Sequence, residues 1–531
     1  MRHYFSLWYL LGLAIVIWRI IYAYWTPLVN QFPVPPGDDP IFHTGQIQSI
    51  LTGNYHFFAS GYPLGFHYFA TGFGRLFGWD AITTIRLIPP LLLVLPVVAI
   101  FFLGTVLFRR PQVGAFAAFL YAVFAQAPLF LFGDGGYPNL LAGHVLLPLA
   151  LGLIILALRI LKPVVIGLAI GVSLAIPLVH HLSTIFFLLA LIPLLAGPVQ
   201  QLFRQRGRLA IFFSLGLVMM VSLVSLGLWF GYQPFISGAF ISLRDSGNLA
   251  GFFGQAIVAP LPPPAVMIFW HGAIFLIIAL HGWLVLAFHK ELTQIGNTPG
   301  VTILSRAKDT PGVKENLRKS CHKENQPAKW WLSLWIFSLL AIGLVPALIF
   351  NQRFLRELVI PLALTGGFGL ATTWDYLTRW RFARLGYGLA LIVLAIVFWL
   401  GKSQAIFGFP APFEYITRVG VDEKAAFVYL DKITPVGGVI AANHGNGYLP
   451  YLVHHPVIIY RDPATIPVIS DNSAITTLFI TALPPLVDPV SGPSLYRNLE
   501  EVSVALKTWP DFELVKTLPS GSVIYRRVTV P

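Results

Sequence analysis

Two adjacent carboxylates, Asp38 and Asp39, follow the first apolar segment of the chain. The chain is 56% hydrophobic and only 11% charged, so a pair of acids at this position is conspicuous. Paired carboxylates can move a proton to or from a substrate, can raise one another's pKa, and can share a divalent cation such as Mg²⁺ or Mn²⁺. We therefore take Asp38 and Asp39 as the candidate active site and as candidate metal ligands.

The residues after this pair predict a helix. Asp39 precedes Pro40, and an Asp cap followed by proline at the first helical position is a typical helix start. Such a helix places Asp39, His43 and Ile47 on one face, four residues apart. The alternative is that the acid is only a cap, in which case this is an interfacial helix with no catalytic role.

The elements that must position these residues are predicted to be membrane-spanning helices. The mean hydropathy is +0.74, and apolar runs of about 20 residues recur from residue 7 almost to residue 402, which is typical of polytopic helical membrane proteins. We predict eleven spans, over residues 7–25, 87–108, 112–131, 140–160, 163–179, 184–199, 209–231, 265–288, 330–350, 358–374 and 385–401. The segments 163–179 and 184–199 are short, so a re-entrant hairpin is an alternative for that pair.

The distribution of Lys and Arg predicts a cytoplasmic N-terminus. With this orientation the cytoplasmic segments hold 19 of the 35 basic residues but five of the 22 acidic ones. The positive-inside rule predicts this bias for a multi-pass protein of the plasma (inner) membrane. The bias also accounts for the net charge of +13, so nucleic acid is not an expected partner.

Three segments then lie on the outer face of the lipid bilayer. The first is an outer loop over residues 26–86, whose aromatic composition suits helices that lie in the membrane interface. The second is the loop over residues 232–264, which contains Arg244. The third is residues 403–531, in which strands and helices alternate. We predict a transmembrane domain over 1–402 and a C-terminal extracytoplasmic α/β domain over 403–531.

The pattern of that third segment can be given in detail. Short apolar segments of strand length occupy residues 438–442, 457–460, 477–480, 512–516 and 522–525. Helical patterns accompany them at 422–432 and 494–507.

Further polar residues at the predicted outer ends of the spans could contact a substrate. Arg353 and Arg356 lie three residues apart in a short outer turn, where two guanidinium groups could clamp a phosphate. The alternative for Arg356 is a contact with Glu357 or with a lipid headgroup. His180 and His181 end a predicted span and could line a cavity. The sequence Gly-Asp-Gly-Gly-Tyr-Pro-Asn over residues 133–139 predicts an outer turn.

The order of these features resembles the glycosyltransferase C superfamily. Its members share an N-terminal span, a long first outer loop that opens with acids, many further spans and an outer C-terminal domain. Protein O-mannosyltransferases and aminoarabinose transferases of this superfamily begin the loop with an Asp-Glu pair. Asp38-Asp39 matches that pair with Asp in the second position, and His43 falls near the position of a His in the mannosyltransferases.

The resemblance implies a membrane glycosyltransferase. The donor would be a polyprenyl-phosphate sugar, and the acceptor a hydroxyl of a glycan, a lipid or a protein. Asp38 or Asp39 would accept the proton of that hydroxyl, and we favour Asp38 because Asp39 is better placed as the cap. Arg353 and Arg356 would stabilise the charge on the leaving phosphate. The other candidate substrate-binding residues are His43, Arg244, His180 and His181.

Trp374-Asp375-Tyr376 resembles part of the Trp-Trp-Asp-Tyr-Gly signature of oligosaccharyltransferases. The flanking Trp and Gly are missing, and the predicted topology puts this segment on the cytoplasmic side. We interpret the similarity as coincidence, which makes a peptide asparagine an unexpected acceptor.

Two other classes of protein remain as alternatives. A transporter or flippase of lipid-linked glycans would place ionisable groups in the middle of the membrane, often in two related halves. A noncatalytic scaffold would use only the outer domain, to bind partners. Alanine at Asp38 and Asp39 would abolish glycan transfer but would spare both of these activities.

Overall fold

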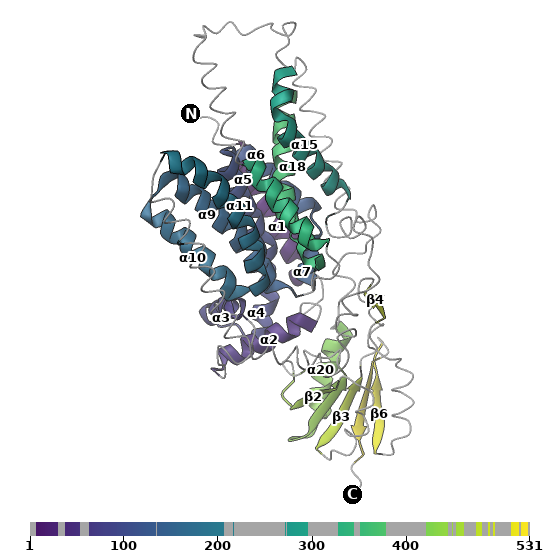
Figure 1. The fold of residues 1–531 in the computed structure, drawn as a ribbon. Helices are drawn as coiled ribbons and strands as arrows, with labels where there is room; N and C mark the ends of the chain where they lie inside the picture. The colour runs from purple at the N-terminus through teal and green to yellow at the C-terminus, as the bar shows by residue number, and fades with distance from the viewer. Residues whose placement is uncertain are drawn as a thin grey trace.

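The computed structural model describes a helical body and a small C-terminal sheet (Figure 1). The residues described are 7–29, 38–53, 63–133, 135–205, 216, 271, 273–295, 328–344, 351–378, 421–443, 449, 453–460, 474–480, 487–488, 492–493, 511–519 and 522–528. The predicted spans 209–231 and 385–401 lie almost entirely outside these residues, as do Arg244 and the helix predicted over 494–507.

The first part of the helical body contains eleven helical segments in the described residues. They are α1 (Leu7–Val29), α2 (Asp38–Leu51), α3 (Gly65–Phe77), α4 (Ala81–Leu87), α5 (Leu91–Phe108), α6 (Pro111–Phe124), α7 (Ala127–Gly133), α8 (Tyr137–Asn139), α9 (Leu147–Ile160), α10 (Pro163–Val179) and α11 (His181–Gln205). A π-helical segment, η1 (Leu140–Leu146), joins α8 to α9. The helices that follow are α15 (Ala273–Ile295), Ala328–Gly343, α17 (Asn351–Arg356) and α18 (Val359–Thr378).

Three stretches of helix in the described residues are long and apolar enough to cross a membrane: Ala81–Phe108, Tyr137–Ile160 and Arg353–Tyr376. Each has at least 24 residues, which corresponds to about 36 Å of helix and exceeds the hydrocarbon thickness of a bilayer. Six shorter apolar helices pack beside them. The predicted pair 163–179 and 184–199 forms two consecutive helices, α10 and α11, with a turn at His180.

The predicted span 112–131 is interrupted. Helix α6 ends at Phe124, Ala125 has an extended backbone, and α7 starts at Ala127. Pro128 explains the break, because in a continuous helix its ring would clash with the carbonyl of Phe124 and it has no N–H to donate to that carbonyl, whereas proline is tolerated in the first turn of α7. The seven-residue α7 leads the chain into the turn at Gly135, which lies against α2.

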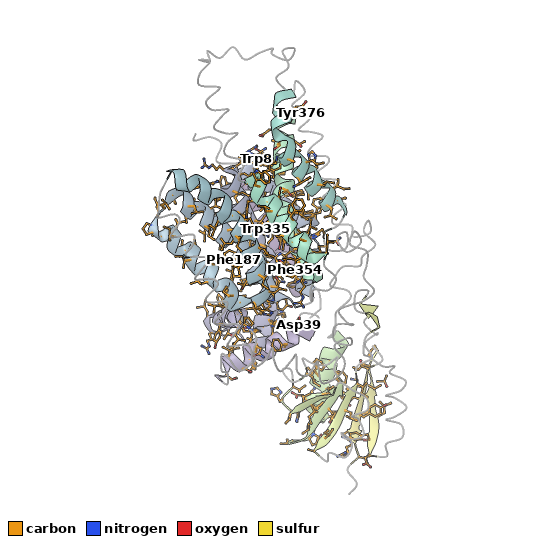
Figure 2. All side chains as sticks on the ribbon, viewed as in Figure 1. Trp8, Asp39, Phe187, Trp335, Phe354 and Tyr376 are labelled. Carbon is orange, nitrogen blue, oxygen red and sulfur yellow. The ribbon has the colours of Figure 1, made fainter. Side chains whose placement is uncertain are left out.

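The candidate acids Asp39 and Asp375 lie at opposite ends of the helical body. Figure 2 shows Trp8 and Tyr376 at one end and Asp39 at the other. Near Tyr376, Arg110 forms an ion pair with Asp375, and Arg159 donates to the carbonyls of Val106 and Leu107. Asp375 therefore lies far from Asp39, in agreement with its interpretation as a residue outside the candidate site.

The C-terminal sheet is built from both parallel and antiparallel strands. Its strand order is β2-β1-β3-β7-β6, with β1 parallel to β2 and β3, and β7 antiparallel to β3 and β6. The strands are β1 (Val439–Asn443), β2 (Val457–Tyr460), β3 (Ile475–Ile480), β6 (Phe512–Thr517) and β7 (Val523–Arg527), and a separate pair is β4 (Val487–Asp488) with β5 (Gly492–Pro493). All five strands predicted from the sequence occur in this sheet.

One helix covers a face of the sheet. Helix α20 (Val421–Ile433) packs Phe427 and Leu430 against Ile440 and Phe479. Alternate residues of a strand point to the same face of a sheet, so each strand can present several apolar side chains to the helix. Ile82 of α4 also packs against this cluster, so the sheet contacts the helical body near α4. The limits of the predicted domains, 1–402 and 403–531, remain predictions.

Candidate active site

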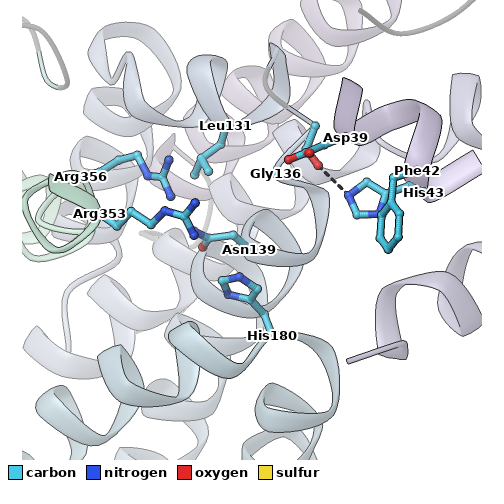
Figure 3. A pocket seen from close by; sticks show the side chains of 10 residues that line it. Asp39, Phe42, His43, Leu131, Gly136, Asn139, His180, Arg353 and Arg356 are labelled. Carbon is cyan, nitrogen blue, oxygen red and sulfur yellow. Dashed lines mark hydrogen bonds between the residues drawn. The ribbon is translucent and has the colours of Figure 1, made fainter. Parts of the chain in front are cut away.

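A pocket of about 180 Å³ opens at the end of the helical body that carries Asp39. Its walls come from α2, from the turn after α7, from α8, from the α10–α11 turn and from α17 (Figure 3). The residues that line it are Asp39, Phe42, His43, Leu131, Gly135, Gly136, Asn139, His180, Arg353 and Arg356. Segments separated by more than 300 residues in the sequence therefore meet at one site.

Helix α2 presents Asp39 to this pocket and buries His43 one turn later. The His43 ring lies 2.9 Å from the Gly135 carbonyl through Nε2 and 2.8 Å from His67 Nε2 through Nδ1. A carbonyl can only accept, so His43 carries its proton on Nε2 and accepts from His67 Nε2–H. The predicted face is thus present, with Asp39 exposed and both His43 and Ile47 buried.

Burial lowers the pKa of His43 to about 4, although its bond to the Gly135 carbonyl partly offsets this effect. Burial and the neighbouring His43 also lower the pKa of His67 well below its ordinary value. Both rings are therefore neutral at physiological pH. This pair orients the Gly135 turn rather than supplying a charge to the pocket.

The low pKa of His43 predicts a loss of stability in acid. The unfolded chain protonates this group near pH 6.5 and the folded protein only near pH 4, so stability is complete above pH 6.5 and falls as the pH decreases toward 4. The loss from His43 reaches roughly 3 kcal/mol. The thermal unfolding midpoint in detergent, measured from pH 7.5 to 4, should decrease less for His43→Gln. An equal decrease in both proteins would contradict this role.

Gly135 allows the turn after α7 to touch α2 directly. Its φ is +79°, which lies in the left-handed region that favours glycine. A Cβ at this position would be 2.7 Å from Asp39 Cβ and 2.8 Å from Pro40 N. These neighbours are the start of a helix and cannot move aside, so the absence of a side chain at residue 135 sets the position of Asp39.

Replacing Gly135 with alanine should displace Asp39 and lower activity by at least about tenfold, since a shift of about 1 Å in a catalytic group can cost a factor of 100. Gly53→Ala is the matched control, because Gly53 has a φ of +76° but no heavy atom within 4 Å of the added Cβ. It should lose only about 1 kcal/mol of stability from backbone strain and keep its activity. Equal activities of the two variants would show that the contact with α2 is dispensable.

Arg353 and Arg356 project from α17 toward the pocket from the side opposite α2 (Figure 3). They lie three residues apart and share a helix face. Arg353 is exposed, whereas Arg356 is only 6% exposed. His271 anchors α17 through a 2.8 Å bond to the Leu355 carbonyl. Two guanidinium groups on one short helix make this wall of the pocket suited to an anion such as phosphate.

His180 completes the wall between the arginines and α2. Its Nδ1 accepts from the backbone N–H of Ser183 at 3.3 Å and lies 2.8 Å from the Ser183 hydroxyl. Because Nδ1 is an acceptor, the neutral ring carries its proton on Nε2. Ser183 Oγ also lies 3.4 Å from Asn139 Oδ1, so both pocket residues are oriented by one serine.

A buried polar cluster lies behind the arginine wall. Glu357, which follows Arg356, accepts from Asn139 Nδ2 at 3.2 Å and lies 3.3 Å from His144 Nε2. Tyr121 Oη is 2.7 Å from His144 Nδ1. Gly143, in the π-helical segment, makes room for this convergence, because a Cβ there would be 2.7 Å from Asn139 Oδ1 and 3.2 Å from Glu357 Oε2. The π-helical segment thus lies at the floor of the site, and such segments are frequent at functional sites.

The pocket brings together five candidates from the sequence. They are Asp39, His43, His180, Arg353 and Arg356. Asp38 begins α2, but its side chain is not among those that the structure describes. Arg244 lies outside the described residues. The ring of His181 lies 5.2 Å from that of His180 but does not line the pocket. The roles assigned to all of these residues remain predictions.

The sequence did not predict three residues that position other residues of the site: Gly135, Asn139 and Glu357. Gly135 and Asn139 belong to a segment interpreted only as a turn, and Glu357 was considered only as a partner of Arg356. The signals were present, since a Gly-rich loop next to a span end can approach another backbone closely, and an acid among apolar residues needs polar partners.

A metal site does not form among the residues that the structure describes. No group of three or more His, Cys, Asp or Glu side chains in these ranges could hold an ion, and Asp39 is the one carboxylate that lines the pocket. Sharing of a divalent cation by Asp38 and Asp39 stays a prediction, because the Asp38 side chain is outside the described set.

No protein-family model matches the sequence, and no curated protein matches it either. Solved structures match nearly the whole chain. The Archaeoglobus fulgidus oligosaccharyltransferase, tethered to an acceptor peptide containing the NVT sequon, has a TM-score of 0.55 at 11% identity over 98% of this chain and 74% of that one. The same enzyme has also been crystallised with zinc and sulfate.

Two further matches are bacterial. ArnT from Cupriavidus metallidurans, bound to undecaprenyl phosphate, has a TM-score of 0.51 at 10% identity and covers 98% of both chains. The arabinofuranosyltransferase AftD from Mycobacteria has a TM-score of 0.50 at 15% identity over 97% of this chain and 40% of that one. All of these proteins are GT-C glycosyltransferases, so this chain has the fold that such enzymes share.

Proposed function

We propose that this chain, which has the GT-C fold, is a membrane glycosyltransferase that moves a sugar from a polyprenyl-phosphate donor to an acceptor hydroxyl. The observation that carries the proposal is the pocket, where one acid faces two arginines and a histidine at a single end of the helical body. That arrangement pairs a proton acceptor with an anion site, as glycosyl transfer from a phosphate requires. The likeness to ArnT bound to undecaprenyl phosphate supports a donor of this class.

The reaction follows from the two walls of the pocket. The acceptor oxygen attacks the anomeric carbon and forms the new glycosidic bond, while its proton passes to the Asp39 carboxylate. The bond between the anomeric carbon and the phosphate oxygen breaks, and its electron pair leaves with the polyprenyl phosphate. Arg353 and Arg356 stabilise the charge that develops on that phosphate, and His180 Nε2–H is a further donor on the same wall.

We propose Asp39 as the general base, in place of Asp38. The sequence favoured Asp38 because Asp39 was expected to cap the helix. However, α2 begins at Asp38, and the Asp39 side chain lines the pocket. We therefore assign the proton transfer to Asp39, and Asp38 is the residue to compare with it.

The lipid part of the donor would enter beside α3. This helix exposes Leu76 and Phe77, and its Phe69, Phe73 and Phe77 rings form a series that ends on Trp79. Exposed aromatic and apolar side chains of this kind suit the boundary between headgroups and acyl chains. The end with Arg110 and Arg159 would be cytoplasmic by the positive-inside rule, so the pocket would open on the outer face of the plasma (inner) membrane.

The C-terminal sheet would help to hold the acceptor. Ile82 of α4 packs against the α20 cluster, which brings the sheet to the end of the helical body where the pocket opens. The acceptor is a hydroxyl of a glycan, a lipid or a protein. A peptide asparagine is not proposed, since Asp375 of the partial oligosaccharyltransferase motif pairs with Arg110 at the other end.

The glycan profile of a deletion strain tests the proposal. Complementation with the wild-type chain should restore a sugar that the deletion removes, and a chain with both Asp38→Ala and Asp39→Ala should not, at equal membrane levels. If both chains restore the sugar, or if no glycan changes on deletion, the transferase assignment fails. The position of the missing sugar would identify the donor and the acceptor.

A further inference from the structure

Glu357 places a buried negative charge directly behind the arginine wall. Its side chain is 2% exposed, and Glu357 Oε1 lies 3.8 Å from Arg356 Nε. Its other neighbours, Asn139 Nδ2 and His144 Nε2, are donors when Tyr121 donates to His144 Nδ1. These three described neighbours all favour the ionised carboxylate. Because a buried charge is costly, its position beside an anion site calls for an explanation.

The charges of the donor and of the product supply an explanation, which rests on the proposed function. A polyprenyl-phosphate sugar is a phosphodiester with one negative charge. The polyprenyl phosphate that remains after transfer is a monoester, which carries nearly two negative charges above pH 7. Two arginines alone would therefore bind the product more tightly than the donor, and the product would block the pocket. A fixed carboxylate nearby repels the doubly charged species about twice as strongly as the singly charged one.

We propose that Glu357 is a positioning residue that offsets the charge of Arg356, so that the pocket discriminates against the phosphate monoester product and releases it. The residue acts through Arg356 and touches neither substrate. Arg356 supplies attraction for both ligands, and Glu357 sets the difference between them.

This proposal predicts a change in selectivity that a purely structural role would not give. Loss of the Glu357 charge should tighten binding of the monoester about tenfold more than binding of the diester. A carboxylate that only holds Arg356 and Asn139 in place would behave differently. Removal of such a carboxylate would weaken the binding of both ligands and leave the ratio of their dissociation constants unchanged.

The experiment uses the full chain in lipid nanodiscs at pH 8. Dissociation constants are measured for geranyl phosphate and for its methyl diester, with geraniol and inorganic phosphate to separate lipid from phosphate contributions. Glu357→Gln and Glu357→Met both remove the charge, so either one is informative if the other does not insert. Glu357→Asp keeps the charge. Tyr121→Phe disturbs the same buried cluster without changing charge.

The expected result is a rise of about tenfold in the monoester preference for Glu357→Gln and Glu357→Met, with no change in that preference for Glu357→Asp or Tyr121→Phe. An unchanged preference in both charge-removing variants overturns the proposal. Arg356→Gln separates this failure from that of the proposed function. If Arg356→Gln binds both esters as tightly as the wild type, the pocket is not a phosphate site at all.

Discussion

Asp39→Asn should lower kcat for sugar transfer by about a thousandfold and leave donor binding nearly unchanged. The substitution keeps the size of the side chain but removes the group that accepts the proton, and general base catalysis contributes about 100- to 10,000-fold. The loss falls on kcat because the proton moves only in the transition state. Initial rates with a radiolabelled polyprenyl-phosphate sugar and purified protein in nanodiscs measure the effect.

Asp38→Asn is the matched control for this prediction. It changes the neighbouring carboxylate in the same helix turn and should cost no more than about tenfold if Asp39 is the base. A larger loss for Asp38→Asn than for Asp39→Asn would assign the base to Asp38, as the sequence suggested. Equal and severe losses, together with dependence on added Mg²⁺ or Mn²⁺, would favour a shared cation.

Arg353→Gln combined with Arg356→Gln should raise the KM for the donor and lower kcat, so that kcat/KM falls by about 1,000-fold or more. Each guanidinium contacts the phosphate in the ground state and more strongly as charge develops on it. A hydrogen bond to a charged group contributes about 1.5–3 kcal/mol, or roughly a factor of ten to 150 for each arginine. Rates measured over a range of donor concentrations separate the two parameters.

Two variants serve as controls for the double substitution: Arg356→Lys in the pocket and Arg110→Gln at the opposite end of the helical body. Arg356→Lys keeps the charge but loses the planar fork, so it should show an intermediate loss. Arg110→Gln removes an arginine at the opposite end, where the residue pairs with Asp375, and should keep full activity. If Arg110→Gln is as damaging as the double variant, the effect is a general loss of folding. If the double variant is active, the arginines bind no phosphate.

Much of the architecture follows from local patterns. Hydropathy alone predicts helices that the structure confirms closely, as at 163–179 for α10 and at 140–160 for the end of Tyr137–Ile160. Short apolar segments of strand length predict the strands of the C-terminal sheet, and Pro40 after Asp39 predicts α2. These features depend on residues within one or two turns of each other, so the sequence itself determines them.

The site is different, because it depends on which distant segments touch. The sequence identified Asp39, His180 and Arg356 as separate candidates, but only helix packing brings them to one pocket. Gly135 could not be recognised as the contact that positions Asp39, since its importance comes from a backbone 95 residues earlier in the chain. Glu357 likewise gains its meaning from Asn139 and His144 on neighbouring helices. Residue types and local periodicity determined the elements and the available chemistry, whereas the tertiary structure decided which charges oppose one another, because electrostatic and steric contacts act through space.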